Sequence, residues 1–302
     1  MRKRLFSTNL LSFERIGDAK SNNVAIFIHG VLGSKKNMRT PAREFIKLNP
    51  NYSSIIVDLR GHGMTPDLPG SNTIEQCAYD LKILIENEIG ETPQMLCAHS
   101  LGGKVALKYL NILYNQKKKL PTNTWILDSL PGKYTFDDVK SDSQSVPRVI
   151  ESLEQIKEPF ESRKVVMDKL IQMGISSSIA QWLGTSVIDT PEGNKWAFRL
   201  PVIKEIFHDF CNLDMWPFLE NYSEFIESSS NDNSSSIIGN LHYVRAGRQK
   251  KWSPEILQKF EDLKIQSNSK IQLYTMPNVG HWMHSEDLPG LLKIIQSNQV
   301  TE

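Results

Sequence analysis

A serine at the junction of an apolar run and a helical pattern constrains the fold more than any other part of this chain. Residues 93–97 predict a buried strand, and residues 104–110 have helical periodicity. The junction reads Ala98-His99-Ser100-Leu101-Gly102-Gly103, so small residues surround Ser100. A strand that turns sharply into a helix leaves room only for small side chains and strains the residue at the turn. This order predicts a nucleophile elbow, and an ordinary loop is the alternative for so short a pattern.

A second junction of strand and loop predicts where negative charge is stabilised. A β-rich run over residues 23–28 ends in His29-Gly30-Val31-Leu32-Gly33-Ser34. In this arrangement two backbone N–H groups point at the substrate carbonyl oxygen, which becomes an alkoxide when the serine attacks. We assign these two groups to Val31 and Leu101. Loss of one such donor typically costs about a hundredfold in rate, so this oxyanion hole matters as much as the serine. The alternative is a tight glycine turn that binds nothing.

The loop at residues 277–282 supplies a candidate base. A serine hydroxyl is a poor nucleophile at neutral pH, so a histidine must take its proton. Residues 271–276 predict a late strand, and the loop that follows carries His281. We therefore predict His281 as the base. His284 lies nearer the start of the last helix, and we expect it to support that turn.

The carboxylate that orients this histidine is predicted at Asp128. Its commonest position is the loop after the penultimate core strand, here residues 241–247, but no acid follows before Glu255. Asp128 ends the buried run of residues 125–127 at the same edge of the predicted sheet, so its side chain can reach the imidazole from another strand. The alternative is that Asp128 only caps the next segment.

Another aspartate, Asp58, also ends an apolar run, at residues 55–57. The turn at residues 59–63 follows at once, and short acidic side chains at such places bind the backbone of the turn. We therefore expect Asp58 to be structural, and we predict Ser100, Asp128 and His281 as the catalytic residues.

These motifs together resemble the α/β-hydrolase-fold serine hydrolases. The resemblance is carried by residues 29–34, 58–63, 98–103 and 280–282. Within that superfamily the chain is most similar to the group of alpha/beta hydrolase domain-containing protein eleven, to related bacterial esterases and to the yeast ethanol acetyltransferases. Three features carry this similarity: the His-Gly-x-x-Gly-Ser loop at residues 29–34, the acid at Asp128 and the segment Lys195-Trp196-Ala197-Phe198-Arg199-Leu200. The resemblance covers nearly the whole chain and implies that fold and a serine triad. Departures are Ala98 for the usual glycine, a polar insert after residue 113 and a polar tract at residues 228–236.

Strand and helix patterns alternate, which predicts an α/β fold with a mostly parallel sheet and helices on both faces. Strands are predicted at residues 11–16, 23–28, 52–58 and 93–97, and helices at residues 42–48, 73–87 and 288–297. Between about residues 134 and 240 the strand signal vanishes and helical patterns replace it, as at residues 148–156, 163–173 and 202–210. We therefore predict a helical lid at residues 134–240, inserted between core parts 10–133 and 241–302.

The lid sequence favours an uncharged substrate. Its large side chains are Trp182, Leu183, Trp196, Phe198, Phe207, Phe210, Met215, Trp216 and Phe218. We expect roughly a third of them to face a small-molecule acyl ester. The predicted activity is that of a serine esterase or lipase-like hydrolase that forms an acyl-Ser100 intermediate and releases it to water. Two alternatives stay open, acyl transfer to an alcohol and a non-catalytic scaffold with the same fold.

Composition argues against several other classes of function. A formal net charge of +1 gives no field that would attract nucleic acid or an anionic membrane. The three cysteines, Cys77, Cys97 and Cys211, are scattered, which indicates reduced thiols in a non-secretory compartment. The histidines form no metal-binding motif and no glycine-rich phosphate loop occurs, so no metal or cofactor is implied. No apolar run approaches the roughly eighteen residues of a membrane span, and the oligomeric state stays open.

The start of the chain has the composition of a mitochondrial presequence. Residues 1–13 are basic, rich in hydroxyl groups and free of acids. Residues 1–9 are predicted to be a basic tail or a short targeting segment, and the resemblance to a group with mitochondrial members favours that organelle. The alternative is a ragged basic terminus on a cytoplasmic protein. The polar tract at residues 228–236 is predicted to be a mobile surface loop.

Overall fold

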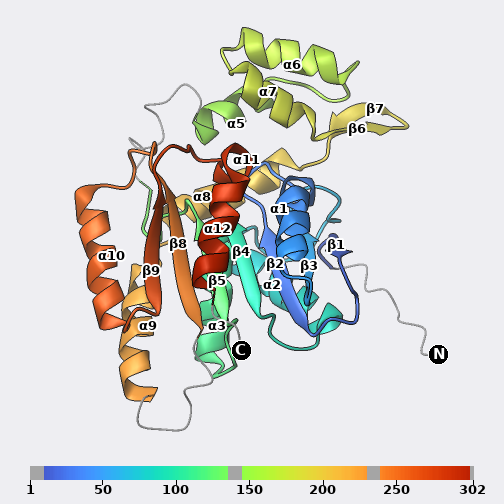
Figure 1. Ribbon diagram of the computed structural model, residues 1–302. Helices are drawn as coiled ribbons and strands as arrows, with labels where there is room; N and C mark the ends of the chain where they lie inside the picture. The colour runs from blue at the N-terminus through green and yellow to red at the C-terminus, as the bar shows by residue number, and fades with distance from the viewer. Residues whose placement is uncertain (1–9, 135–144, 230–238, 300–302) are drawn as a thin grey trace, which may run out of the picture.

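A seven-stranded sheet forms the centre of the structure, a computed structural model that describes residues 10–134, 145–229 and 239–299. The strand order is β1-β3-β2-β4-β5-β8-β9 (Figure 1). The strands are β1 Phe13–Ile16, β2 Asn23–Ile28, β3 Tyr52–Val57, β4 Met95–His99, β5 Asn123–Leu127, β8 Asn240–Ala246 and β9 Ile271–Met276. Strand β1 is antiparallel to β3, and the other neighbouring pairs of the described sheet are parallel. The predicted α/β fold with a mostly parallel sheet is confirmed.

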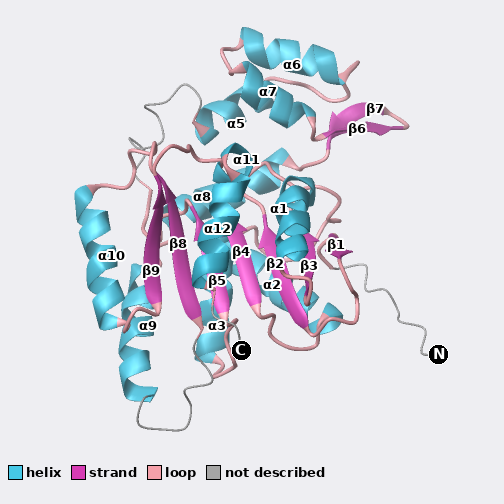
Figure 2. Ribbon diagram, in the orientation of Figure 1, coloured by secondary structure: helices cyan, strands magenta, loops and turns pink. Residues whose placement is uncertain are grey.

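Helices cover both faces of this sheet (Figure 2). On one face α1 Lys35–Leu48 and α12 Leu288–Asn298 pack against strand residues such as Phe27 and Trp125. On the other face α2 Ile74–Glu88, α3 Leu101–Asn115 and α10 Pro254–Gln266 pack against residues such as Ile26 and Ile55. Strands buried on both faces need apolar side chains at nearly every position, which is why these segments are continuous apolar runs in the sequence.

Helix α1 begins at Lys35, earlier than the predicted start at residue 42. Pro41 lies inside this helix. Proline is most often found in the first turn of a helix, so its presence favours a start close to residue 41. Here the helix continues through it, with the buried side chains of Met38 and Phe45 on the face that packs on the sheet.

The chain between β5 and β8 contains five described helices and a hairpin. They are α5 Val146–Glu154, α6 Arg163–Gln172, α7 Ser177–Gly184, β6 Val187–Thr190, β7 Gly193–Trp196, α8 Leu200–Asn212 and α9 Trp216–Ser229. The expectation that this insertion lacks strands is wrong, because β6 and β7 form an antiparallel pair. Each strand has four residues, which is too short to give a clear alternating pattern.

Helices α5, α6 and α7 and the hairpin lie beyond one end of the sheet (Figure 1). Helix α9 instead packs on α10, where the rings of Trp216 and Phe260 lie 5.4 Å apart. The division into a lid and two core parts stays a prediction. Of the predicted polar loop, residues 228 and 229 end helix α9, while residues 230–236 and the tail at residues 1–9 lie outside the described residues.

Candidate active site

Ser100 occupies the sharp turn between β4 and α3. Its backbone angles are φ 53° and ψ −119°, and a non-glycine residue adopts a positive φ only at a cost in free energy. The glycines that follow permit the close approach of helix and strand. A Cβ atom on Gly102 would lie 2.6 Å from the carbonyl oxygen of His29, and one on Gly103 would lie 2.7 Å from Cβ of Ser129. Larger residues at these two positions would push α3 away from the sheet.

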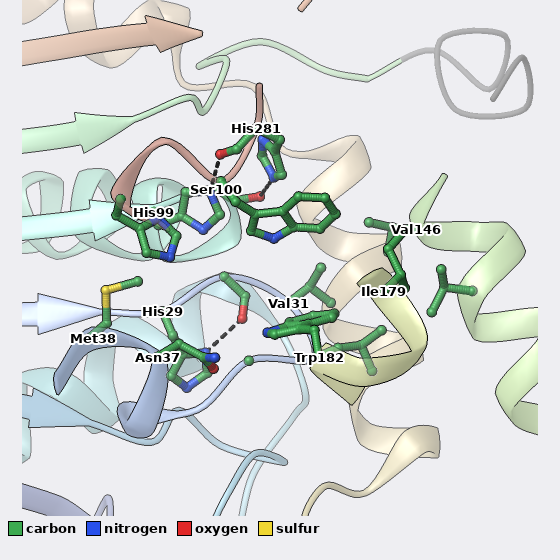
Figure 3. Close-up of a pocket in the computed structure, with 16 residues that line it drawn as sticks. His29, Val31, Asn37, Met38, His99, Ser100, Val146, Ile179, Trp182 and His281 are labelled. Atoms are coloured by element: carbon green, nitrogen blue, oxygen red, sulfur yellow. Dashed lines mark hydrogen bonds between the residues drawn. The ribbon is translucent and has the colours of Figure 1, made fainter. Parts of the chain in front are cut away.

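His281 lies on the loop between β9 and α11 Met283–Glu286, and its ring faces Ser100 (Figure 3). Its Nε2 atom is 3.0 Å from Oγ of Ser100, and its Nδ1 atom is 2.6 Å from Oδ2 of Asp128. The ring of His99 donates a hydrogen bond from Nε2 to the main-chain carbonyl of His281 and so holds this loop. Burial lowers the pKa of His281, and the charge of Lys251 lowers it further, while Asp128 opposes both effects. A neutral imidazole is the form that accepts a proton.

Asp128 follows β5 directly and is fully buried. Besides His281, it accepts hydrogen bonds at Oδ1 from the amide of Ala246 and from Nε1 of Trp252. Nζ of Lys251 lies 3.0 Å from Oδ2. Burial by itself raises the pKa of Asp128, but the Lys251 charge and the hydrogen bonds outweigh burial, so the pKa is lowered. The carboxylate is therefore ionised at neutral pH and orients the His281 ring.

The other acids and the other histidine considered from the sequence, Glu255, Asp58 and His284, make no hydrogen bond to Ser100 or His281 among the described residues. Glu255 is exposed in the first turn of α10. His284 is buried in α11 with its ring 4.5 Å from that of His99, and burial lowers its pKa to about 4. It packs on His99, whereas the turn before α12 is capped by Asp287. Asp58 accepts hydrogen bonds from Nζ of Lys35 and from the main-chain N–H just after its own turn, at Met64.

The predicted oxyanion donors lie on the two loops beside Ser100. Leu32, which follows Val31, has a φ of 58°, and its amide donates to Nε2 of His62 at 3.1 Å. Nδ1 of His62 donates to the carbonyl of Arg60, so the ring is anchored at both nitrogens. Within the described part of the chain, the N–H groups of Val31 and Leu101 have no hydrogen-bond acceptor. Both groups are therefore available to a substrate oxygen, and their role in catalysis stays a prediction.

Comparisons with known proteins agree with this fold. The family model described as serine aminopeptidase, S33, matches residues 19–127. A mouse (Mus musculus) protein named sn-1-specific diacylglycerol lipase ABHD11 is 26% identical over 291 residues, which cover 96% of this chain and 84% of the relative. The ABHD11 of Danio rerio is 24% identical over 267 residues, or 86% of this chain and 73% of the relative. A solved structure of a marine microorganism esterase has a TM-score of 0.73 at 18% identity, covering 96% of this chain and 99% of that one.

This chain has the α/β-hydrolase fold. The resemblance to the ABHD11 group predicted from its motifs is confirmed by these matches. The relatives are named lipases and the structural neighbour is named an esterase.

A small pocket in the protein opens onto Ser100 (Figure 3). Its volume is about 40 Å³, room for a few water-sized groups. The apolar lining comes mainly from Val31, Met38, Val146, Val149, Ile179, Trp182 and Trp282. Of the nine large lid side chains singled out in the sequence, all of them described, Trp182 lines this pocket. Trp196 and Phe198 line a separate groove formed by α5, β7 and α8.

The sequence reasoning overlooked Lys251 and Trp252 of this hydrolase. Both follow β8, the place where the acid was expected and not found, and both bind Asp128, the acid that follows β5. That stretch meets the same edge of the sheet as Asp128, so its polar side chains could have been proposed as partners. Among the described residues no group of three or more His, Cys, Asp or Glu side chains could hold a metal ion. None of the described helices is long and apolar enough to cross a membrane.

Proposed function

We propose that this α/β hydrolase cleaves uncharged carboxylic esters through an acyl-Ser100 intermediate, with water as the acceptor. The observation that carries the proposal is a continuous set of hydrogen bonds from Ser100 Oγ through the His281 ring to Asp128. This set ends in an apolar pocket, where a neutral acyl group gains free energy by leaving water.

In the first half of the reaction Ser100 is the nucleophile. Nε2 of His281 takes the Oγ proton as Oγ bonds to the ester carbonyl carbon, and Asp128 stabilises the imidazolium that forms. The carbonyl oxygen becomes an alkoxide and accepts hydrogen bonds from the N–H groups of Val31 and Leu101. The C–O bond to the alcohol then breaks, and the imidazolium returns its proton to the departing oxygen.

In the second half water replaces the alcohol. His281 removes a proton from water, whose oxygen attacks the acyl carbon, and the same two N–H groups stabilise the second alkoxide. Collapse of this intermediate releases the carboxylic acid and returns the proton to Ser100.

The pocket dimensions favour short acyl groups. A cavity of about 40 Å³ beside Ser100 accepts only a few heavy atoms beyond the carbonyl. Val149 of α5 and Ile179 of α7 also line this cavity, so both helices limit the space beside Ser100. The lipase names of the relatives favour a role in lipid metabolism.

We propose a mitochondrial location, with the cytoplasm as the alternative. The support is the basic, hydroxyl-rich and acid-free composition of the first thirteen residues. Fractionation of cells that express the chain with a C-terminal tag tests it, because a variant without residues 2–9 should then stay in the cytosol.

Labelling with a fluorophosphonate probe tests the chemistry. The probe forms a bond with an activated serine, so we expect the wild type to be labelled and Ser100→Ala not to be labelled. Hydrolysis of p-nitrophenyl acetate, butyrate and octanoate should be fastest for the shorter esters and absent in Ser100→Ala and His281→Gln. The matched control is Ser129→Ala, which removes a buried hydroxyl close to the elbow but outside the proposed triad.

Labelling of Ser100→Ala at the rate of the wild type would refute the assignment of the nucleophile. Labelling without hydrolysis, together with ester formation when ethanol is added, would instead favour acyl transfer.

A further inference from the structure

Lys251 makes two contacts with one buried aspartate. It lies on the loop between β8 and α10, and its Nζ atom donates a hydrogen bond of 3.0 Å to the main-chain carbonyl of Asp128. The same atom lies 3.0 Å from Oδ2 of the Asp128 side chain. The Lys251 side chain is 16% exposed and that of Asp128 is fully buried. Little water screens this pair, so its electrostatic effect is larger than that of a surface ion pair.

The backbone of Asp128 needs such support. Its φ is 46°, in the left-handed region that costs a non-glycine residue free energy. Its amide is held by the carbonyl of Val244 at 2.8 Å. Lys251 holds its carbonyl, so hydrogen bonds secure both peptide groups of this strained residue.

We propose that Lys251 is a positioning residue for ester hydrolysis, whose ammonium group holds Asp128 in place and shares the Oδ2 atom with the ring of His281. The inference rests on the proposed function, in which His281 is the base.

The shared oxygen links the charge of Lys251 to the base. Oδ2 is 3.0 Å from Nζ of Lys251 and 2.6 Å from Nδ1 of His281, so the two nitrogens lie within about 6 Å of each other. A cation at that distance disfavours a second cation, and it therefore keeps the His281 ring neutral and ready to accept the Ser100 proton. The lowered pKa of His281 agrees with this effect.

Other charged and titratable groups also face these two side chains. Glu286 of α11 favours the protonated form of His281 but is paired with Arg248. His99 packs on the ring of His281, and His284 packs on His99. The aromatic ring of Tyr134 lies 5.9 Å from Nζ of Lys251. Among these groups, Lys251 is the cation that contacts the Asp128 carboxylate directly.

The pH dependence of kcat/KM separates this role from a purely structural one. The acid limb of the profile reports the pKa of the base in the free enzyme. Lys251→Met and Lys251→Gln remove the positive charge, so we expect the acid limb for p-nitrophenyl acetate to move up by about one pH unit. Lys251→Arg keeps the charge and should leave the limb at the wild-type position. The neighbouring exposed Lys250 supplies the control, and Lys250→Met should match the wild type.

The ring of His281 is also followed directly by NMR titration, with its signal assigned by comparison with His281→Gln. This measurement requires no substrate, so it tests the role of Lys251 even if the wild type hydrolyses no ester. Absence of ester hydrolysis by the wild type would count against the proposed function and not against the role of Lys251. Lys251→Gln keeps a hydrogen-bond donor and serves if Lys251→Met does not fold. An acid limb and a His281 titration that are unchanged in both neutral variants would overturn the proposal.

Discussion

Replacement of Asp128 by asparagine tests the arrangement around the proposed base. Oδ1 of Asp128 accepts hydrogen bonds from Ala246 and Trp252, and an amide oxygen can keep both. The amide nitrogen must then face Nδ1 of His281, which becomes an acceptor. The ring proton moves to Nε2, and Nε2 can no longer take the proton of Ser100. We expect kcat/KM to fall by about 10⁴-fold, as loss of the correct tautomer does in serine hydrolases, which corresponds to about 5 kcal/mol of transition-state stabilisation.

The same substitution removes the carboxylate partner of Lys251. Leaving a mostly buried charge without its partner costs about 3 kcal/mol or more in the free energy of unfolding. Asp80→Asn is the matched control, because Asp80 is also buried and pairs with Arg60 at 2.8 Å. Asp80 lies on α2 and does not line the pocket at Ser100. It should lose similar stability and keep kcat/KM close to that of the wild type.

Both variants are measured by p-nitrophenyl ester hydrolysis at a temperature where urea unfolding shows them to be folded. A folded Asp128→Asn enzyme with kcat/KM within tenfold of the wild type would refute the reasoning. If Glu255→Gln is inactive instead, the orienting acid is on α10 and not at the end of β5.

Two further predictions follow from the pocket and from the buried histidines. The ring of Trp182 packs beside that of Trp282 at 6.0 Å, and both line the pocket. Trp182→Ala enlarges the pocket, so the ratio of kcat/KM for octanoate to that for acetate should rise about tenfold. An unchanged ratio contradicts the predicted limit on chain length. Burial lowers the pKa of His62 to about 3 and those of His242 and His284 to about 4. Below the ordinary value of 6.5 the unfolded chain therefore binds more protons than the folded one, so stability decreases as the pH falls through 6.5. From pH 7.5 to pH 5.5 these three residues should lower the free energy of unfolding by about 4 kcal/mol, which urea unfolding measures. Equal stability at pH 7.5 and pH 5.5 would show that the three rings are also protonated in the folded protein at pH 5.5.

The motifs around Ser100 could be located from the sequence because each depends on local chain geometry. The strand, the small residues and the helix are adjacent in the chain, and the steric demand of a sharp turn acts on neighbouring residues. Asp128 and His281 could be proposed for a related reason, since both follow apolar runs and parallel strands end at one edge of the sheet. The structure brings the three side chains together through hydrogen bonds of 3.0 and 2.6 Å.

The hairpin β6–β7 and the size of the pocket could not be read from the sequence in this way. Strands of four residues are stabilised by pairing with each other, and the backbone hydrogen bonds of a pair leave little trace in the order of side chains. The pocket is small because α5 and α7 place Val149, Ile179 and Trp182 near Ser100. That placement depends on how the inserted helices pack on the sheet.

The amino-acid order alone thus determined the alternation of strands and helices, the strained serine and the two strand ends that carry an acid and a histidine. Periodicity, small residues and turn chemistry act over a few neighbouring residues, so they are visible in one dimension. Tertiary structure decided that Lys251 and Trp252 contact Asp128, although more than a hundred residues separate them from it in the chain. Contacts of that kind depend on the packing of whole elements, and the ionisation of the site follows from burial and charge that exist only once the chain has folded.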